Sequence, residues 1–186
     1  DRLMLMENIV SPRAVREQAA LEDVSAVMEG SPCLCTVGRF SHAKGMDRAV
    51  RIAARLVEMG MNGLRWYLAG YGDEASLRRE IAAHGMEEHV VILGKKANPY
   101  PYMAACGLYV QPSRYEGKAV AVREAQILGR PVAITRFPTA SGHVGRKVYR
   151  AKAVRCRSIS SALLDRELRR FTSSANYMLN CGFGTL

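Results

Sequence analysis

The chain has 186 residues, 48% of them hydrophobic, and carries 27 Lys and Arg against 17 Asp and Glu, a formal net charge of +10. This length suits one ordinary domain, and no apolar run approaches the roughly 20 residues that a membrane-spanning helix needs. The excess charge is concentrated in residues 142–186, which hold 9 Lys and Arg against 2 Asp and Glu. The rest of the chain is almost balanced, which argues against a nucleic-acid-binding face.

Five cysteines are scattered along the chain, and no two show the C-x2-C spacing of a zinc site. We therefore expect a reducing, cytoplasmic setting, with Cys33 and Cys35 buried as small hydrophobic residues. No metal-ligand cluster is apparent, so neither a metal nor a cofactor is expected. The first residues do not resemble a signal peptide, and the absence of an initial Met suggests a fragment of a longer protein.

Strand and helix patterns alternate through residues 31–141, after a linker and leading helix in residues 1–30. The leading helix is predicted over Arg13–Met28, with Ser11-Pro12 before it as the cap. Apolar runs that end at glycine or polar residues predict buried strands at Cys33–Val37, Arg65–Ala69, Val90–Leu93, Leu108–Gln111 and Val132–Thr135. Amphipathic patterns predict helices at Met46–Met59, Glu74–His84, Pro99–Ala105 and Val120–Leu128. Apolar strands separated by helices indicate an α/β domain with a doubly wound, Rossmann-like parallel sheet.

The first loop after a strand, Gly38–Gly45, is a candidate anion site. In open parallel sheets ligands bind beyond the carboxyl ends of the strands, and this loop places Arg39 and Lys44 there, directly before a helix. A guanidinium, an ammonium and the amides of a helix N-terminus can all face one diphosphate. A solvated turn with two unrelated cations explains this loop alone equally well.

The loop Gly70–Ala75 fits the dinucleotide-binding fingerprint in its weakest form. The next strand leads into Lys95-Lys96 and lacks the acidic residue that would hold the ribose of NAD. Glycines that let a strand and a helix pack closely explain this loop adequately, so NAD is disfavoured.

The loop before the last predicted helix carries Glu116, and the helix itself carries Glu124, eight residues later. Both carboxylates can border one cleft, and backbone N–H groups near Gly117–Val120 can meet a phosphate. A carboxylate on a helix can accept hydrogen bonds from both hydroxyls of a ribose. These residues therefore extend the candidate anion site.

The order of these segments resembles the family 4, or group 1, glycosyltransferases. The matching segments are Val37–Gly45, Gly70–Gly72, Gly94, Pro112–Ala125 and Gly129–Val132. The resemblance covers roughly residues 7–141 and implies the C-terminal, donor-binding half of a GT-B architecture, of the type that builds bacterial surface polysaccharides. It implies transfer of a hexose, with retention, from a nucleotide-diphospho-sugar to a glycan or lipid-linked acceptor.

The resemblance also implies roles for single residues. Arg39 and Lys44 would bind the diphosphate, Glu124 the ribose and Glu116 the sugar, so that Glu116, Arg39 and Lys44 form the catalytic set. The other implied donor-binding positions are Gly38, Gly94, Lys95, Gly117, Lys118 and Ala119. Because the acceptor site would lie in an absent N-terminal domain, the isolated chain is expected to transfer little. A non-catalytic nucleotide-binding module is the alternative.

Two features depart from the family pattern. Lys118-Ala119 stands where the family has an aromatic residue and glycine, which alters the sugar pocket and adds a cation. This cation fits an acidic or phosphate-rich environment, and a solvated lysine explains it equally well. Residues 142–186 form an atypical basic tail, in which residues 142–160 contain no acidic residue before family-like sequence returns at Leu163–Arg170. A local reading-frame change is one hypothesis for this segment. The other is a basic arm that contacts anionic lipid at the inner face of the membrane.

Overall fold

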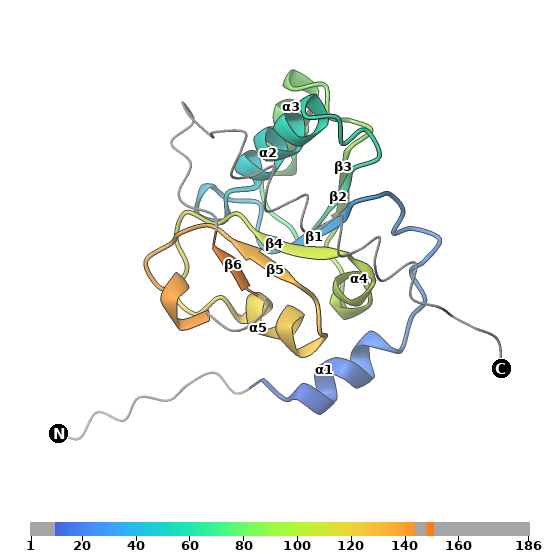
Figure 1. Cartoon of the computed structure of the whole chain (residues 1–186), viewed down its shortest axis with the longest axis vertical. Helices are drawn as coiled ribbons and strands as arrows, with labels where there is room; N and C mark the ends of the chain where they lie inside the picture. Colours follow the sequence, from blue (N-terminus) through green and yellow to red (C-terminus); the bar gives the residue numbers. More distant parts are fainter. Residues whose placement is uncertain (1–9, 144–147, 151–186) are drawn as a thin grey trace. The chain divides into compact units, whose positions relative to one another are not determined.

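A computed structural model describes residues 10–143 and 148–150, all within one compact unit, Asp1–Lys152. Six parallel strands form a single sheet in the order β3-β2-β1-β4-β5-β6 (Figure 1). They are β1 (Cys33–Val37), β2 (Arg65–Ala69), β3 (Val90–Gly94), β4 (Leu108–Gln111), β5 (Val132–Ile134) and β6 (Val148–Arg150). The predicted doubly wound α/β sheet is confirmed, and each of the five predicted strands is present.

Helices cover both faces of this sheet. Figure 1 shows α2 (Met46–Glu58) and α3 (Glu74–Ala83) on one face, and α4 (Tyr100–Ala105) and α5 (Val120–Ile127) on the other. The leading helix α1 (Pro12–Ala19) packs against α4 and α5. Two short 3-10 helices, η1 (His42–Lys44) and η2 (Ala140–His143), lie in the loops after β1 and β5.

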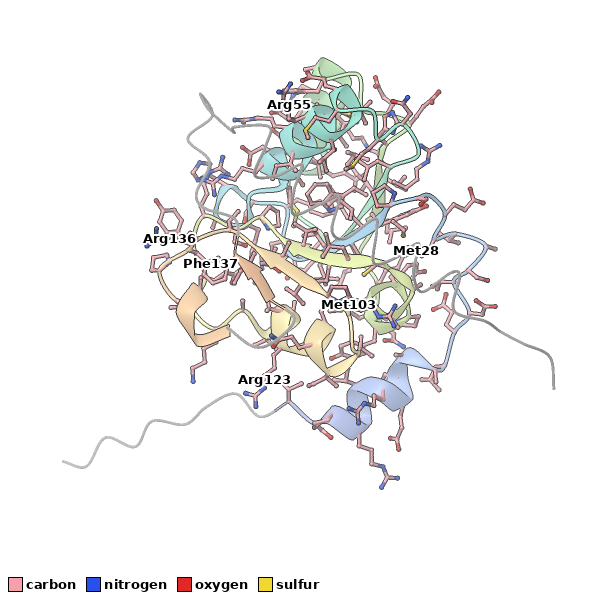
Figure 2. The ribbon with its side chains drawn as sticks, viewed as in Figure 1. Met28, Arg55, Met103, Arg123, Arg136 and Phe137 are labelled. Atoms are coloured by element: carbon pink, nitrogen blue, oxygen red, sulfur yellow. The ribbon has the colours of Figure 1, made fainter. Side chains whose placement is uncertain are left out.

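The core fills the space between the sheet and these helices. Trp66 and Leu68 of β2 are fully buried, as are Tyr109 of β4 and Met103 of α4. Figure 2 shows Met103 and Phe137 directed into the interior, while Arg55 on α2 points outward. Burying side chains of this size supplies most of the free energy that holds such a domain together.

Three cysteines, Cys33, Cys35 and Cys106, are buried and unpaired with one another. Burial is the main cause that raises the pKa of the Cys33 thiol to about 11, which disfavours the reactive thiolate. The prediction that Cys33 and Cys35 act as small buried hydrophobic residues is therefore confirmed. Cys156 and Cys181 lie outside the described residues.

Two elements differ from the sequence prediction. The leading helix ends at Ala19 instead of Met28. Within the remaining part of the predicted helix, Asp23 accepts a hydrogen bond from the Ser25 amide at 2.9 Å, which is typical of a turn. Val24 is thereby placed in the core. The strand β6 was not predicted, since it has three residues in a basic segment, and it pairs with β5 beyond the expected boundary at residue 141. Apart from Gly142 and His143 in η2, the remainder of the basic tail lies outside the described residues.

The strand order defines where a ligand can bind. From β1 the chain builds outward through β2 and β3, and then returns to place β4 on the other side of β1. The loops after β1 and β4 therefore diverge at the carboxyl edge of the sheet and leave a crevice between them. In open α/β sheets this switch point is where ligands bind.

Candidate functional site

A cavity of about 460 Å³ lies at this switch point. Its walls come from the loops after β1, β2, β3 and β4 and from the start of α5. The predicted site residues that line it are Gly38, Arg39, Lys44, Lys95, Glu116, Lys118, Ala119 and Glu124. The other two predicted positions, Gly94 and Gly117, do not line it. The carbonyl of Gly94 instead accepts a hydrogen bond from the Gly70 amide at 2.9 Å.

Lys44 and Glu116, 72 residues apart, form an ion pair on the wall of the cavity. The Lys44 Nζ lies 2.8 Å from Glu116 Oε1 and 2.7 Å from Oε2. The Glu116 side chain is only 4% exposed, whereas that of Lys44 is 31% exposed. The carboxylate is thus held inside the wall and the ammonium faces the cavity.

Buried polar side chains fix Glu116 from behind. Ser113 Oγ donates to Glu116 Oε1 at 2.6 Å, and Gln111 Nε2 donates to the same oxygen at 3.0 Å. Gln111 is oriented in turn by the Tyr109 hydroxyl, which donates to its Oε1 at 2.8 Å. Because a buried carboxylate needs its lone pairs satisfied, this network accounts for a charged group in the protein interior.

The pairing changes how Lys44 can meet a ligand. An ammonium group has three N–H donors, and two of them are directed at Glu116, so one remains for a phosphate oxygen. Arg39 is exposed, and its guanidinium lies 5.7 Å from the centre of the Tyr71 ring. Arg39 is therefore the more accessible of the two predicted anion-binding cations.

Tyr71 connects two of the cationic loops. Tyr71 lines the cavity and is 51% exposed as a residue. The Lys95 Nζ lies 5.5 Å from the centre of its ring, close to the 5.7 Å of the Arg39 guanidinium. The backbone of Tyr71 is fixed as well, because its carbonyl accepts from the Phe40 amide at 2.7 Å. The aromatic ring thus orients the cations of the loops after β1 and β3 toward the same cavity.

Glu124 lies at the opposite end of the cavity, on α5. Its Oε1 accepts a hydrogen bond from the Tyr100 hydroxyl at 2.8 Å. Burial, followed by this bond to a carboxylate, raises the pKa of Tyr100 to about 12, so the hydroxyl keeps its proton. A second cavity of about 460 Å³, between α1 and α5, shares Glu124 with the first.

The two loops that carry Lys44 and Glu116 are fastened to each other. The Arg114 guanidinium binds both carboxylate oxygens of Asp47 at 2.6 and 2.5 Å, and it donates to the His42 carbonyl at 2.9 Å. Gly45 has φ +68°, and a Cβ at that position would lie 2.3 Å from the carbonyl oxygen of Pro112. The loops therefore approach so closely that only glycine fits at this position.

We expect the Asp47–Arg114 pair to make stability depend on pH. Hydrogen bonding from Arg114 is the main cause that lowers the pKa of Asp47. A carboxyl whose folded pKa lies below its unfolded value of about 3.9 stabilises the fold above that value and loses this contribution as the pH falls through the folded pKa. The unfolding free energy of the wild type should therefore exceed that of Asp47→Asn at pH 7, and the difference should shrink below about pH 4.

Urea denaturation at pH 7, 5, 4 and 3 measures this difference. Glu87→Gln, at an exposed position, controls for the loss of one negative charge. A difference between wild type and Asp47→Asn that stays constant over this range would contradict the ion-pair assignment.

Three residues that line the cavity at the switch point and have defined contacts were not predicted as site residues: Tyr71, Lys96 and Gln111. Tyr100, which borders the second cavity and donates a hydrogen bond to Glu124, was not predicted either. Gln111 had a usable signal, since it is the polar last residue of an otherwise apolar strand and precedes Pro112-Ser113. The tyrosines had none, because their roles depend on contacts between distant loops. Lys96 lies with its Nζ 5.1 Å from the centre of the Tyr102 ring.

Within residues 10–143 and 148–150, no three His, Cys, Asp or Glu side chains gather as a metal site would require. In the same part of the chain, every helix is too short or too polar to cross a membrane.

The sequence of this chain matches a known protein family. Residues 31–163 match the family model described as glycosyl transferases group 1. The chain belongs to this family. The match begins just before β1 and includes every lining residue of the cavity at the switch point.

The chain is also similar to individual curated proteins and solved structures. The chain is 31% identical over 108 residues to a 2-deoxystreptamine glucosyltransferase of Streptomyces kanamyceticus, covering 56% of this chain and 28% of that protein. TarM of S. aureus superposes with a TM-score of 0.67 at 18% identity, over 83% of this chain and 31% of that one. HepE of Anabaena, solved with UDP-glucose, superposes with a TM-score of 0.62 at 21% identity, over 77% of this chain and 39% of that one.

The glycosyltransferase structures place this fold as one Rossmann-like half of a GT-B architecture. The chain spans only 22% to 30% of the length of four curated relatives that it matches.

Proposed function

We propose that this chain is the donor-binding domain of a retaining hexosyltransferase. Its substrate would be a nucleoside diphospho-sugar, and its acceptor a glycan or a lipid-linked sugar held by a further domain. The observation that carries the proposal is that one cavity, at the switch point, is lined by all four of Arg39, Lys44, Glu116 and Glu124. Two of the structural relatives were solved with UDP, which fits this substrate class.

The cavity offers a group for each part of such a donor. Arg39 and the remaining N–H of Lys44 would bind the diphosphate, next to the loop that leads into α2. Glu124 would accept the ribose hydroxyls through the oxygen atom that Tyr100 does not occupy. Glu116 borders the space that remains for the transferred sugar.

These positions support the following chemical step. Transfer breaks the bond between the sugar and the diphosphate, so negative charge develops on the leaving diphosphate. Arg39 and Lys44 would stabilise that charge, and they are already oriented, since Tyr71 and Glu116 hold them in place. A phosphate oxygen of the donor would accept the proton of the attacking hydroxyl on the same face of the sugar, which retains the anomeric configuration. No residue of this chain needs to become covalently attached.

Isothermal titration of the chain with uridine, guanosine and adenosine diphosphates tests donor binding. We expect one of the three to bind, and Arg39→Ala to weaken that binding at least tenfold, since a charged hydrogen bond contributes about 1.5–3 kcal/mol. Arg79→Ala is the matched control, because Arg79 is exposed on α3, away from the cavity. Equal affinities of the wild type and Arg39→Ala would refute the proposed site.

A further inference from the structure

We propose that Tyr100 is a positioning residue for the ribose of the donor: its hydroxyl holds the Glu124 carboxylate in the orientation that selects a nucleotide with both ribose hydroxyls. The inference rests on the proposed function, which assigns the ribose to Glu124, and it adds the residue that makes Glu124 selective. It is carried by the hydrogen bond between the two side chains and by their places beside the two cavities.

The Glu124 carboxylate has to be oriented before it can accept hydrogen bonds from two hydroxyls. The last torsion of a glutamate side chain has a broad distribution, so the carboxylate turns easily when nothing holds it. Glu124 is half-buried on α5, at the border of both cavities. The Tyr100 hydroxyl, on the first residue of α4, donates to its Oε1 at 2.8 Å, an ordinary O–H···O distance. This bond restricts the rotation of the carboxylate and so determines where its Oε2 lies.

Tyr100 reaches Glu124 from outside the donor cavity. Glu124 lines both cavities, whereas Tyr100 lines the second cavity, between α1 and α5, and does not line the one at the switch point. The hydroxyl can therefore orient the carboxylate without occupying the space of the nucleotide. Burial and the bond to the carboxylate raise the pKa of Tyr100 to about 12, so the hydroxyl remains a donor at neutral pH.

Tyr100 is itself held in place by neighbouring elements. Its amide donates to Asn98 Oδ1 at 3.2 Å, and Asn98 Nδ2 donates to the carbonyl of Gln18, near the end of α1, at 2.7 Å. Its ring packs against the core cluster that includes Met103. Because both the backbone and the ring are fixed, the hydroxyl is preorganised for Glu124. Ribose binding then does not have to order the carboxylate.

Paired nucleotides that differ only in the ribose hydroxyls test the inference. We would measure, by isothermal titration, the dissociation constants of uridine, guanosine or adenosine diphosphate, whichever binds, and of its 2′,3′-dideoxy form. The wild type should prefer the ribonucleotide at least about tenfold, as one hydrogen bond to a charged group predicts. Tyr100→Phe should reduce this preference about fivefold, because binding must then order the carboxylate, and leave the affinity for the dideoxynucleotide within about twofold.

Tyr102→Phe is the matched control. Tyr102 lies on the same helix, and its hydroxyl donates at 3.5 Å to Glu22, which lines neither cavity, so this variant should keep the wild-type preference. In a Glu124→Ala background, Tyr100→Phe should have no further effect on the preference, because the carboxylate that it orients is gone. Tyr100→Phe removes one oxygen atom and keeps the ring, so it should still unfold cooperatively in urea.

An unchanged preference in Tyr100→Phe would overturn the inference and leave the proposed function intact. An equal loss of affinity for both nucleotides would also overturn it, since a purely structural role gives that result. A wild type that binds the ribonucleotide and its dideoxy form equally would overturn the assignment of the ribose to Glu124, and the inference with it. Failure of every nucleoside diphosphate to bind would overturn both proposals.

Discussion

Lys44→Ala should abolish measurable donor binding and destabilise the fold by about 2–3 kcal/mol, because it leaves the buried carboxylate of Glu116 without its cation. Removing one partner of a buried ion pair costs more than the pair contributes, since the remaining charge stays in the protein interior. Because Lys44 is partly exposed, we expect a smaller loss of unfolding free energy than for a fully buried ion pair. Urea denaturation and titration with the bound nucleotide measure the two effects separately.

A double-mutant cycle with Glu116→Gln isolates the ion pair. In Lys44→Ala combined with Glu116→Gln no unpaired charge remains, so most of the lost stability should return while donor binding stays absent. Arg55→Ala is a matched surface control: its pair with Glu58 is exposed, and its loss should change stability by about 0.5 kcal/mol or less. If Lys44→Ala were as stable as the wild type, Glu116 would not depend on Lys44.

Gly70→Ala should destabilise the fold by at least about 3 kcal/mol, because a Cβ at Gly70 would lie 1.8 Å from the carbonyl oxygen of Gly38. The conflict is between two backbone segments, so no side chain can rotate to relieve it. It would push apart the loops that carry Arg39 and Tyr71, and donor affinity should fall with stability. Thermal and urea unfolding of the purified variant measure the effect.

Gly85→Ala separates the steric conflict from the cost of an unusual backbone conformation. Gly85 also has a positive φ, +63°, but nothing lies within 4 Å of where its Cβ would be. This variant should lose only about 1 kcal/mol. Equal losses in the two variants would mean that the close approach of Gly70 to Gly38 does not limit stability.

The strands were predictable because both faces of this sheet are covered. Each strand is therefore an uninterrupted apolar run, and the turn residues that follow mark its end. The helix α1 was predicted too long, because the apolar spacing continues past Ala19 although Asp23 turns the chain. The strand β6 could not be predicted from a pattern, since its three residues stand in a basic segment and pair only with β5.

The candidate site, like the fold, was predictable from the sequence in part. The sequence could predict that four side chains share one crevice, because they follow strands whose carboxyl ends lie at one edge of the sheet. These side chains are Arg39, Lys44, Glu116 and Glu124. That Lys44 is bound by Glu116 could not, because the contact joins residues 72 positions apart and depends on side-chain conformations. The sequence therefore predicts which residues share the cavity, whereas the three-dimensional contacts show that Lys44 is already paired with Glu116.

The most direct test of the central claim is a crystal structure of the chain soaked with the nucleoside diphosphate that binds it. The account predicts the diphosphate within hydrogen-bonding distance of Arg39 and Lys44, and the ribose at the Glu124 oxygen that Tyr100 leaves open. Nucleotide bound in the other cavity, between α1 and α5, would contradict the account, as would a cavity at the switch point that stays empty at saturating nucleotide.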